Sequence, residues 1–277
     1  MKIVIKRHLR DYQVFRVCAV AQAIAARQAE VDPNEPCELY VECLSEHKAV
    51  LDLFPSLKWK DPHRPYQTHK IDAKGLHVGF NQHFDKVIDL DAGGPFEARW
   101  TTSGLDWWAW ISQCVSQYEG DLAIPEFPTL ERAPVQPSES GEFVVVSPTS
   151  DESDFRDVSF EKVCFLIRSI YPGIKIVTVY GPPAKLAAHL WGAKAVFAVN
   201  GLAAALSQSL WGEKPLVTNL YFINPPDRRT KDPFASMRAM IKTGLGRPPG
   251  SNPVKIIDTT PDLSLSLRAA PEPAAQL

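Results

Sequence analysis

Asp11 is the first candidate for a catalytic side chain. It follows an apolar segment at residues 2–6 and a basic turn, and it stands where a helix begins. In a parallel sheet, ligands bind where strands end and helices start, and a carboxylate there can act as a general base on a hydroxyl. The same place suits an N-cap, because Asp is a favoured capping residue. The sequence leaves both roles open.

A second polar cluster follows the apolar segment at 143–147. Ser147 and Thr149 are followed by Arg156 and by a helix start at Ser159. Hydroxyls, free backbone N–H groups and a cation are the groups that hold a diphosphate. The alternative is a loop of Ser/Thr turns that leads to an N-cap.

A third candidate is the pair Asn200 and Gly201, which precedes an alanine-rich helix. A glycine at this point lets a ligand approach the backbone closely, and the helix dipole favours an anion. A simple tight turn is the alternative.

The acidic side chains Asp89, Asp91 and Glu97 could bind Mg²⁺ or Ca²⁺. The intervening Gly-Gly-Pro at 93–95 favours an ordinary loop instead. The histidines are dispersed, and the five cysteines include no CxxC pair. We therefore expect no metal site. The absence of a GxGxxG pattern also argues against a dinucleotide cofactor.

The elements that must position these residues alternate between strand and helix. In the first half, strands are predicted at 2–6, 38–42 and 86–90, and helices at 12–29, 47–53 and 105–118. The apolar residues of the segment 12–29 recur at spacings of three and four, which indicates one face of an amphipathic helix. Alternating strands and helices predict an α/β fold with parallel sheets.

The pattern restarts after a proline-rich stretch at 121–142. Strands are then predicted at 143–147, 175–180, 195–199 and 215–219, and helices at 159–169, 184–190, 201–211 and 234–243. We predict two Rossmann-like lobes with a cleft between them, formed by residues 1–120 and 143–260. The stretch 121–142 would be an exposed linker, about which the lobes could close, and 261–277 a flexible tail.

Composition narrows the classes of function. The chain of 277 residues is 45% hydrophobic and 22% charged, with a net charge of -2, so it lacks the global basic field of a nucleic-acid-binding protein. No apolar run reaches the roughly 18 residues of a membrane span, and no secretory signal is recognised. We expect a cytoplasmic protein with reduced cysteines.

Several segments in this order resemble the ADP-heptose:lipopolysaccharide heptosyltransferase-like family of GT-B glycosyltransferases. IVIKRHLRDYQVFRV is similar to the family's strand, basic loop and first helix, and KVIDLDAGGPFE to its strand with an acidic loop. VVVSPTSDESDFRDVSFEKV, VTVYGPPAK and GAKAVFAVNGLAAALSQSLWGEKPLV resemble segments of its second lobe. The family's Asp-Ser-Gly-Pro is reduced here to Asn200-Gly201, and the accompanying His is missing.

The resemblance implies a role for each matched residue. Asp11 would be the catalytic base, with Arg7, Arg10 and Glu97 on the acceptor side. The donor site would consist of the following residues: Ser147, Thr149, Arg156, Gly181, Asn200 and Gly201. It also implies that no bound metal is needed. No cofactor is expected, because the nucleotide-sugar is a substrate.

The expected function is therefore the transfer of a sugar from a nucleotide-sugar to a hydroxyl. A saccharide acceptor is favoured, and a hydroxymethylated base in DNA is the other option, to which the basic turn at 6–10 points. The alternative of a different class is a non-catalytic nucleotide- or sugar-binding protein on a GT-B scaffold, which the altered donor motif would support.

Overall fold

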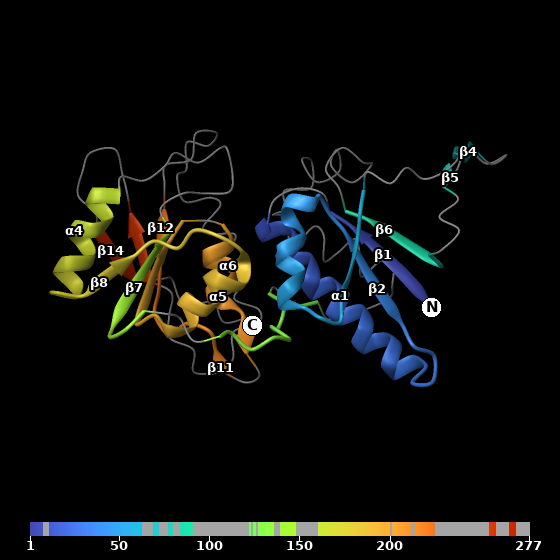
Figure 1. Cartoon of the computed structure of the whole chain (residues 1–277), viewed down its shortest axis with the longest axis horizontal. Coiled ribbons are helices and arrows are strands. Elements are labelled where there is room, and N and C mark those ends of the chain that lie inside the picture. Colours follow the sequence, from blue (N-terminus) through green and yellow to red (C-terminus); the bar gives the residue numbers. More distant parts are fainter. Residues whose placement is uncertain are drawn as a thin grey trace, which may run out of the picture.

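The chain forms two α/β lobes, each built around its own sheet (Figure 1). The computed structural model describes residues 1–7, 11–62, 69–71, 77–79, 84–90, 122, 124–125, 127–135, 139–147, 160–199, 201–211, 214–224, 255–258 and 266–269. The predicted α/β class with two Rossmann-like lobes is confirmed. The helices predicted at 105–118 and 234–243 lie outside the described residues.

The N-terminal lobe contains a four-stranded parallel sheet with the order β3-β2-β1-β6. From β1 the chain moves outward to β2 and β3, then returns to the other side of β1 to form β6. β1 and β6 therefore flank a topological switch point, the usual place for a ligand in such a sheet. Its elements are β1 (Lys2–Lys6), α1 (Asp11–Val31), β2 (Glu38–Glu42), the 3-10 helix η1 (Ser45–Leu53), β3 (Lys58–Lys60) and β6 (Lys86–Asp89), with a separate hairpin of β4 (His69–Ile71) and β5 (His77–Gly79).

The C-terminal lobe contains a six-stranded sheet with the order β14-β13-β12-β9-β7-β8. All pairs are parallel except β13 with β14. Here the switch point lies between β7 and β9. The elements are β7 (Phe143–Ser147), α4 (Phe160–Ile170), β8 (Lys175–Val177), α5 (Pro183–Gly192), β9 (Ala195–Ala198), α6 (Leu202–Gln208), β12 (Leu220–Asn224), β13 (Lys255–Asp258) and β14 (Ser266–Ala269), with a hairpin of β10 (Leu210–Trp211) and β11 (Lys214–Pro215).

Three predictions in this lobe are corrected. The strand predicted at 215–219 is wrong: β12 occupies Leu220–Asn224, and Leu216 and Val217 are buried outside the main sheet. The helix predicted at 201–211 ends at Gln208, because Leu210 and Trp211 pair with β11. The flexible tail predicted at 261–277 is wrong at Ser266–Ala269. These residues form β14, the edge strand of the sheet, which pairs with β13.

The first half of α1 is buried on every side, although its sequence predicts a single apolar face. Each residue from Tyr12 to Ala21 is buried, whereas only Ile24 is buried in the remainder of the helix. A helix that is buried all round must be covered by more than one element. The sheet of its own lobe covers one side, and α6 of the other lobe packs against another.

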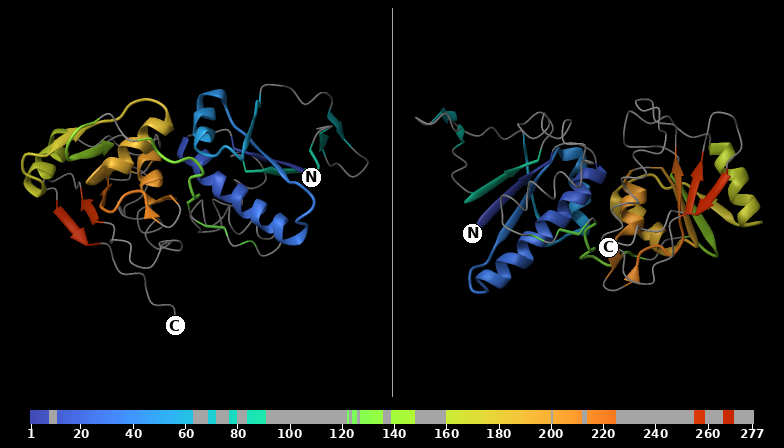
Figure 2. Two further views of the ribbon diagram at one scale, coloured as in Figure 1. Left: turned by 60° about the horizontal axis from the view of Figure 1, so that its bottom comes forward. Right: turned by 180° about the vertical axis from the view of Figure 1, so that it is seen from behind.

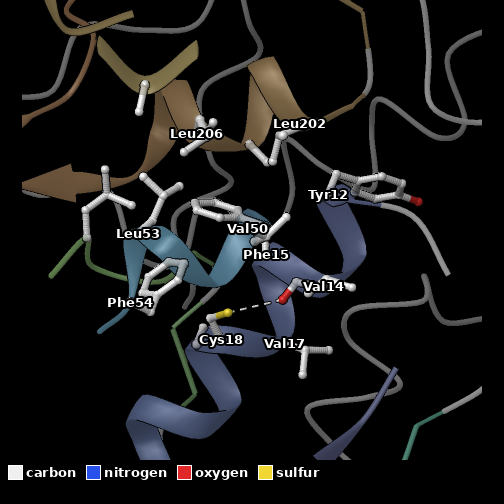
Figure 3. Close-up of a cluster of buried hydrophobic side chains, with 14 of the residues drawn as sticks. Tyr12, Val14, Phe15, Val17, Cys18, Val50, Leu53, Phe54, Leu202 and Leu206 are labelled. Atoms are coloured by element: carbon white, nitrogen blue, oxygen red, sulfur yellow. Dashed lines mark hydrogen bonds between the residues drawn. The ribbon is translucent and has the colours of Figure 1, made fainter. Parts of the chain in front are cut away.

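One apolar core is shared by the two lobes. Figure 3 shows side chains of α6 pointing toward α1 and η1, and Figure 2 shows this arrangement of the helices from two further directions. The residues labelled at this contact are Tyr12, Phe15, Val50, Leu53, Leu202 and Leu206, and all belong to one cluster of buried side chains. We call this contact the interlobe seam.

The segment between the lobes packs against the first lobe, so the prediction of an exposed linker is corrected at 128–131. Pro128 and Leu130 are buried. The amide of Gln22 on α1 pairs with the backbone of Thr129, donating to its carbonyl at 2.7 Å and accepting from its N–H at 3.0 Å. Glu131 accepts hydrogen bonds from the backbone and the hydroxyl of Ser56.

Candidate active site

Arg7 lies at the switch point of the N-terminal lobe and is buried there, with 3% of its surface exposed. Its guanidinium donates to the carbonyl of Leu90, just after β6, at 2.6 Å, and to Oε1 of Gln13 on α1 at 2.6 and 3.1 Å. The Gln13 amide donates in turn to the Tyr12 hydroxyl at 3.0 Å. Arg7 therefore joins the ends of β1 and β6 to the start of α1. A contact with an acceptor stays a prediction.

Asp11 is the first residue of α1, and its side chain is 36% exposed. Its Oδ1 lies 2.7 Å from Nδ1 of His47 on η1. Because an ionised carboxylate only accepts hydrogen bonds, this contact is a hydrogen bond in the tautomer that carries a proton on Nδ1. The Nε2 atom of the same ring lies 3.4 Å from Oε1 of Glu46. The carboxylate of Asp11 is thus both partly open to solvent and held by a second titratable side chain.

The carboxylate charge at this place affects a neighbouring thiol. Burial and then the Asp11 charge raise the pKa of Cys43 to about 12. Glu42, the last residue of β2, is buried beside it and forms an ion pair with Lys60. The backbone N–H of Arg7 donates to the Glu42 carbonyl at 2.9 Å. Acidic groups therefore gather at the carboxyl end of this sheet.

In the C-terminal lobe, Ser147 and Gly201 flank the switch point. Ser147 is the last residue of β7, and its carbonyl accepts a hydrogen bond from the N–H of Val199 at 3.1 Å, just beyond β9. Gly201 is buried and precedes α6, where its carbonyl accepts from Ala205 at 3.0 Å. Of the residues predicted for the donor site, Ser147 therefore ends β7, and Gly201 follows the adjacent strand β9. Diphosphate binding there stays a prediction.

Gly181 lies in the turn between β8 and α5, and its backbone requires glycine. Its φ of +123° is one that residues with a side chain rarely adopt. Pro182 follows as the residue that precedes α5, and Pro183 begins that helix. This geometry explains the glycine locally, and its contact with a donor stays a prediction.

The interlobe seam connects the two switch points. α1 starts at the switch point of the first lobe with Asp11, and α6 starts at that of the second lobe after Gly201. The first turns of these helices meet, with Leu202 facing Tyr12 and Phe15 (Figure 3). The fold thus places the predicted base and one edge of the predicted donor site at the same end of the seam.

Other predicted site residues lie outside the described residues, namely Arg10, Glu97, Thr149, Arg156 and Asn200. Within the described ranges, no group of three or more His, Cys, Asp or Glu side chains is placed to hold a metal ion. The same ranges contain no helix long and apolar enough to span a membrane.

His47 is not among the site residues that the sequence predicts. Its link to Asp11 joins residues 36 positions apart, so no local spacing reveals it. The proximity of the two residues could have been predicted from the sheet topology. Both follow parallel strands that were predicted correctly, and the carboxyl ends of adjacent parallel strands lie at the same edge of a sheet.

No protein-family model and no curated protein sequence matches the chain. Among solved structures, it is similar to the iron-containing dodecameric glycosyltransferase TibC from enterotoxigenic Escherichia coli, with 9% identity and a TM-score of 0.49 over 81% of this chain and 59% of that one. The chain therefore spans less than two thirds of the length of TibC.

Two further similar structures match over most of both chains. The E. coli heptosyltransferase WaaC with ADP has 14% identity and a TM-score of 0.46, over 82% of this chain and 88% of that one. The glycosyl transferase of family 9 from Veillonella parvula has 11% identity and a TM-score of 0.47, over 88% and 91%. A likeness of this degree assigns no activity.

Proposed function

We propose that the protein is a glycosyltransferase that moves a sugar from a nucleotide-sugar to a hydroxyl acceptor. The observation that carries the proposal is the position of Asp11. This partly exposed carboxylate stands at the switch point of one lobe, on the helix that packs against α6 of the other. A base on one lobe and a donor on the other is an arrangement suited to transfer between two bound substrates.

In this proposal the donor binds to the C-terminal lobe. Its diphosphate is held by Ser147, Thr149 and Arg156, and the remainder of its site includes Gly181, Asn200 and Gly201. Hydroxyls, backbone N–H groups and a guanidinium would stabilise the charge that develops on the departing diphosphate. The nucleotide-sugar is a substrate, and no further cofactor takes part.

The acceptor enters from the N-terminal lobe, beside Asp11, with Arg10 and Glu97 on the acceptor side. Arg7 contributes by holding the ends of β1 and β6 against α1, as its buried hydrogen bonds indicate. We propose a saccharide as the acceptor. Binding to duplex DNA that weakens steeply with salt would instead point to a base in DNA.

Calorimetry with a panel of nucleoside diphosphates, followed by turnover of the matching nucleotide-sugars, tests the donor class. The decisive variant is Asp11→Asn, since the Asn carbonyl can still accept the hydrogen bond from His47. We expect turnover to fall about 10²–10⁴-fold, while affinity for the diphosphate changes little. Asn caps a helix as well as Asp does, so a role in capping alone predicts normal turnover. Normal turnover in Asp11→Asn would therefore contradict the catalytic role.

A further inference from the structure

His47 and Asp11 are brought together by the topology of the sheet. α1 follows β1 and η1 follows β2, and these two strands are parallel neighbours. Their carboxyl ends point the same way, so the start of α1 and the start of η1 meet at one edge. The contact between Asp11 Oδ1 and His47 Nδ1, at 2.7 Å, lies within this edge.

The two side chains differ in exposure. The side chain of His47 is 15% exposed and that of Asp11 is 36% exposed. The ring also lies near Glu46 through its Nε2 atom, at 3.4 Å, and it belongs to an element that packs on both α1 and α5. His47 is therefore the more buried and better supported of the pair, and Asp11 is the one that solvent reaches.

We propose that His47 is a positioning residue for Asp11. Its Nδ1–H bond holds Oδ1 and fixes the orientation of the carboxylate, which leaves Oδ2 to receive the acceptor proton. The inference rests on the proposed function. In the step concerned, the acceptor O–H bond breaks and its proton passes to Asp11. The acceptor oxygen forms a bond to the sugar carbon, and the electron pair of the broken sugar–phosphate bond leaves with the nucleoside diphosphate.

Two amide substitutions separate this role from general packing. The amide nitrogen of Asn corresponds in position to Nδ1 of histidine, and that of Gln corresponds to Nε2. His47→Asn therefore retains the donor that faces Asp11, and His47→Gln loses it. Because a base misplaced by about 1 Å loses about 10²-fold in rate, we expect kcat of the Gln variant to lie about 10- to 100-fold below that of the Asn variant. The acceptor KM and the donor affinity should be similar in the two.

Measuring kcat, KM and donor affinity for both variants, with circular dichroism as the folding control, gives distinct outcomes. Equal kcat in the two variants, whether high or low, overturns the positioning role, because only one of them keeps the bond. An equal rise in the acceptor KM or an equal loss of donor affinity in the two variants, without a difference in kcat, also overturns it. If the unsubstituted protein turns over no nucleotide-sugar, the proposed function fails and the inference fails with it. If the unsubstituted protein turns over a nucleotide-sugar but the two variants have equal kcat, only the inference is overturned.

A spectroscopic measurement covers the case in which the Gln variant does not fold. In the full chain labelled with ¹⁵N-histidine, the His47 signal is identified by its loss in His47→Asn. We expect neutral His47 to carry its proton on Nδ1, and we expect the nitrogen shift to change in Asp11→Asn. A neutral His47 protonated on Nε2 would overturn the inference without any assay of activity.

Discussion

At the scale of single residues, the pKa of Cys43 depends on the burial of its thiol and on the charge of Asp11. The thiol is fully buried, and burial followed by the Asp11 carboxylate raises its pKa to about 12. The unfolded chain releases this proton near the ordinary thiol pKa of 9.0. Between these two values the folded protein holds a proton that the unfolded chain has lost.

This difference makes stability depend on pH. Because the folded pKa lies above the unfolded one, the stabilisation is fully present below pH 9 and is lost as the pH rises toward 12. The slope is about 1.4 kcal/mol per pH unit for one such group. We therefore predict that the free energy of unfolding in urea falls above pH 9, and that it falls less steeply in Cys43→Ala. If the free energies of unfolding of the two proteins differed by the same amount at every pH from 7 to 10.5, the raised pKa of Cys43 would be contradicted.

The candidate site shows what can be predicted for single residues. Asp11 could be nominated because it follows an apolar strand and begins a helix, which are local features. The hydrogen bond from Arg7 to the Leu90 carbonyl and the link between His47 and Asp11 were not found, because both join residues far apart in sequence. Residue type and position nominate a group, and the topology decides which groups surround it.

At the scale of elements, strands and helices were predicted best where apolar periodicity is strong. The strands at 2–6, 38–42 and 143–147 have the predicted bounds. The error at 215–219 arose because Leu216 and Val217 are buried, as strand residues would be, yet they lie in the loop before β12. Burial of a short apolar segment does not distinguish a strand from a packed loop. β3 is three residues long, too short to give a periodic signal.

The connection between the lobes is held against the first lobe by a contact with α1. Gln22 makes two hydrogen bonds to the Thr129 backbone. We predict that Gln22→Ala lowers the free energy of unfolding by about 1–3 kcal/mol, at about 0.5–1.5 kcal/mol per bond. Gln28→Ala on the same helix is the control and should change it by less than about 0.5 kcal/mol. Equal effects of the two substitutions in urea unfolding would show that the Thr129 contact adds no stability.

At the scale of the whole molecule, the interlobe seam makes the two sheets depend on one core. Phe15, Leu53 and Leu206 are all buried in the same cluster, although they come from different lobes. A wide rigid-body opening of the lobes would expose these side chains to water, at about 25 cal/mol for each Å² of apolar surface. The shared core therefore opposes such a wide opening of the lobes.

The same seam predicts that the protein unfolds as one cooperative unit. Leu206→Ala removes a buried side chain at the seam and should lower the free energy of unfolding by about 2–5 kcal/mol. The test is hydrogen exchange in low urea, followed in peptides that contain β1 and β9, one from each lobe. We expect Leu206→Ala to lower the free energy of opening equally in both peptides.

The substitution Ile167→Ala tests more directly whether the two lobes unfold together. Ile167 lies on α4 in the second core cluster, which belongs to the C-terminal lobe alone. If the lobes unfolded independently, this substitution would destabilise β9 and leave β1 at its original value. Because the two lobes share the larger core, we expect the loss measured at β9 to appear at β1 as well. A β1 peptide that keeps its full protection in Ile167→Ala would show that the seam does not couple the lobes.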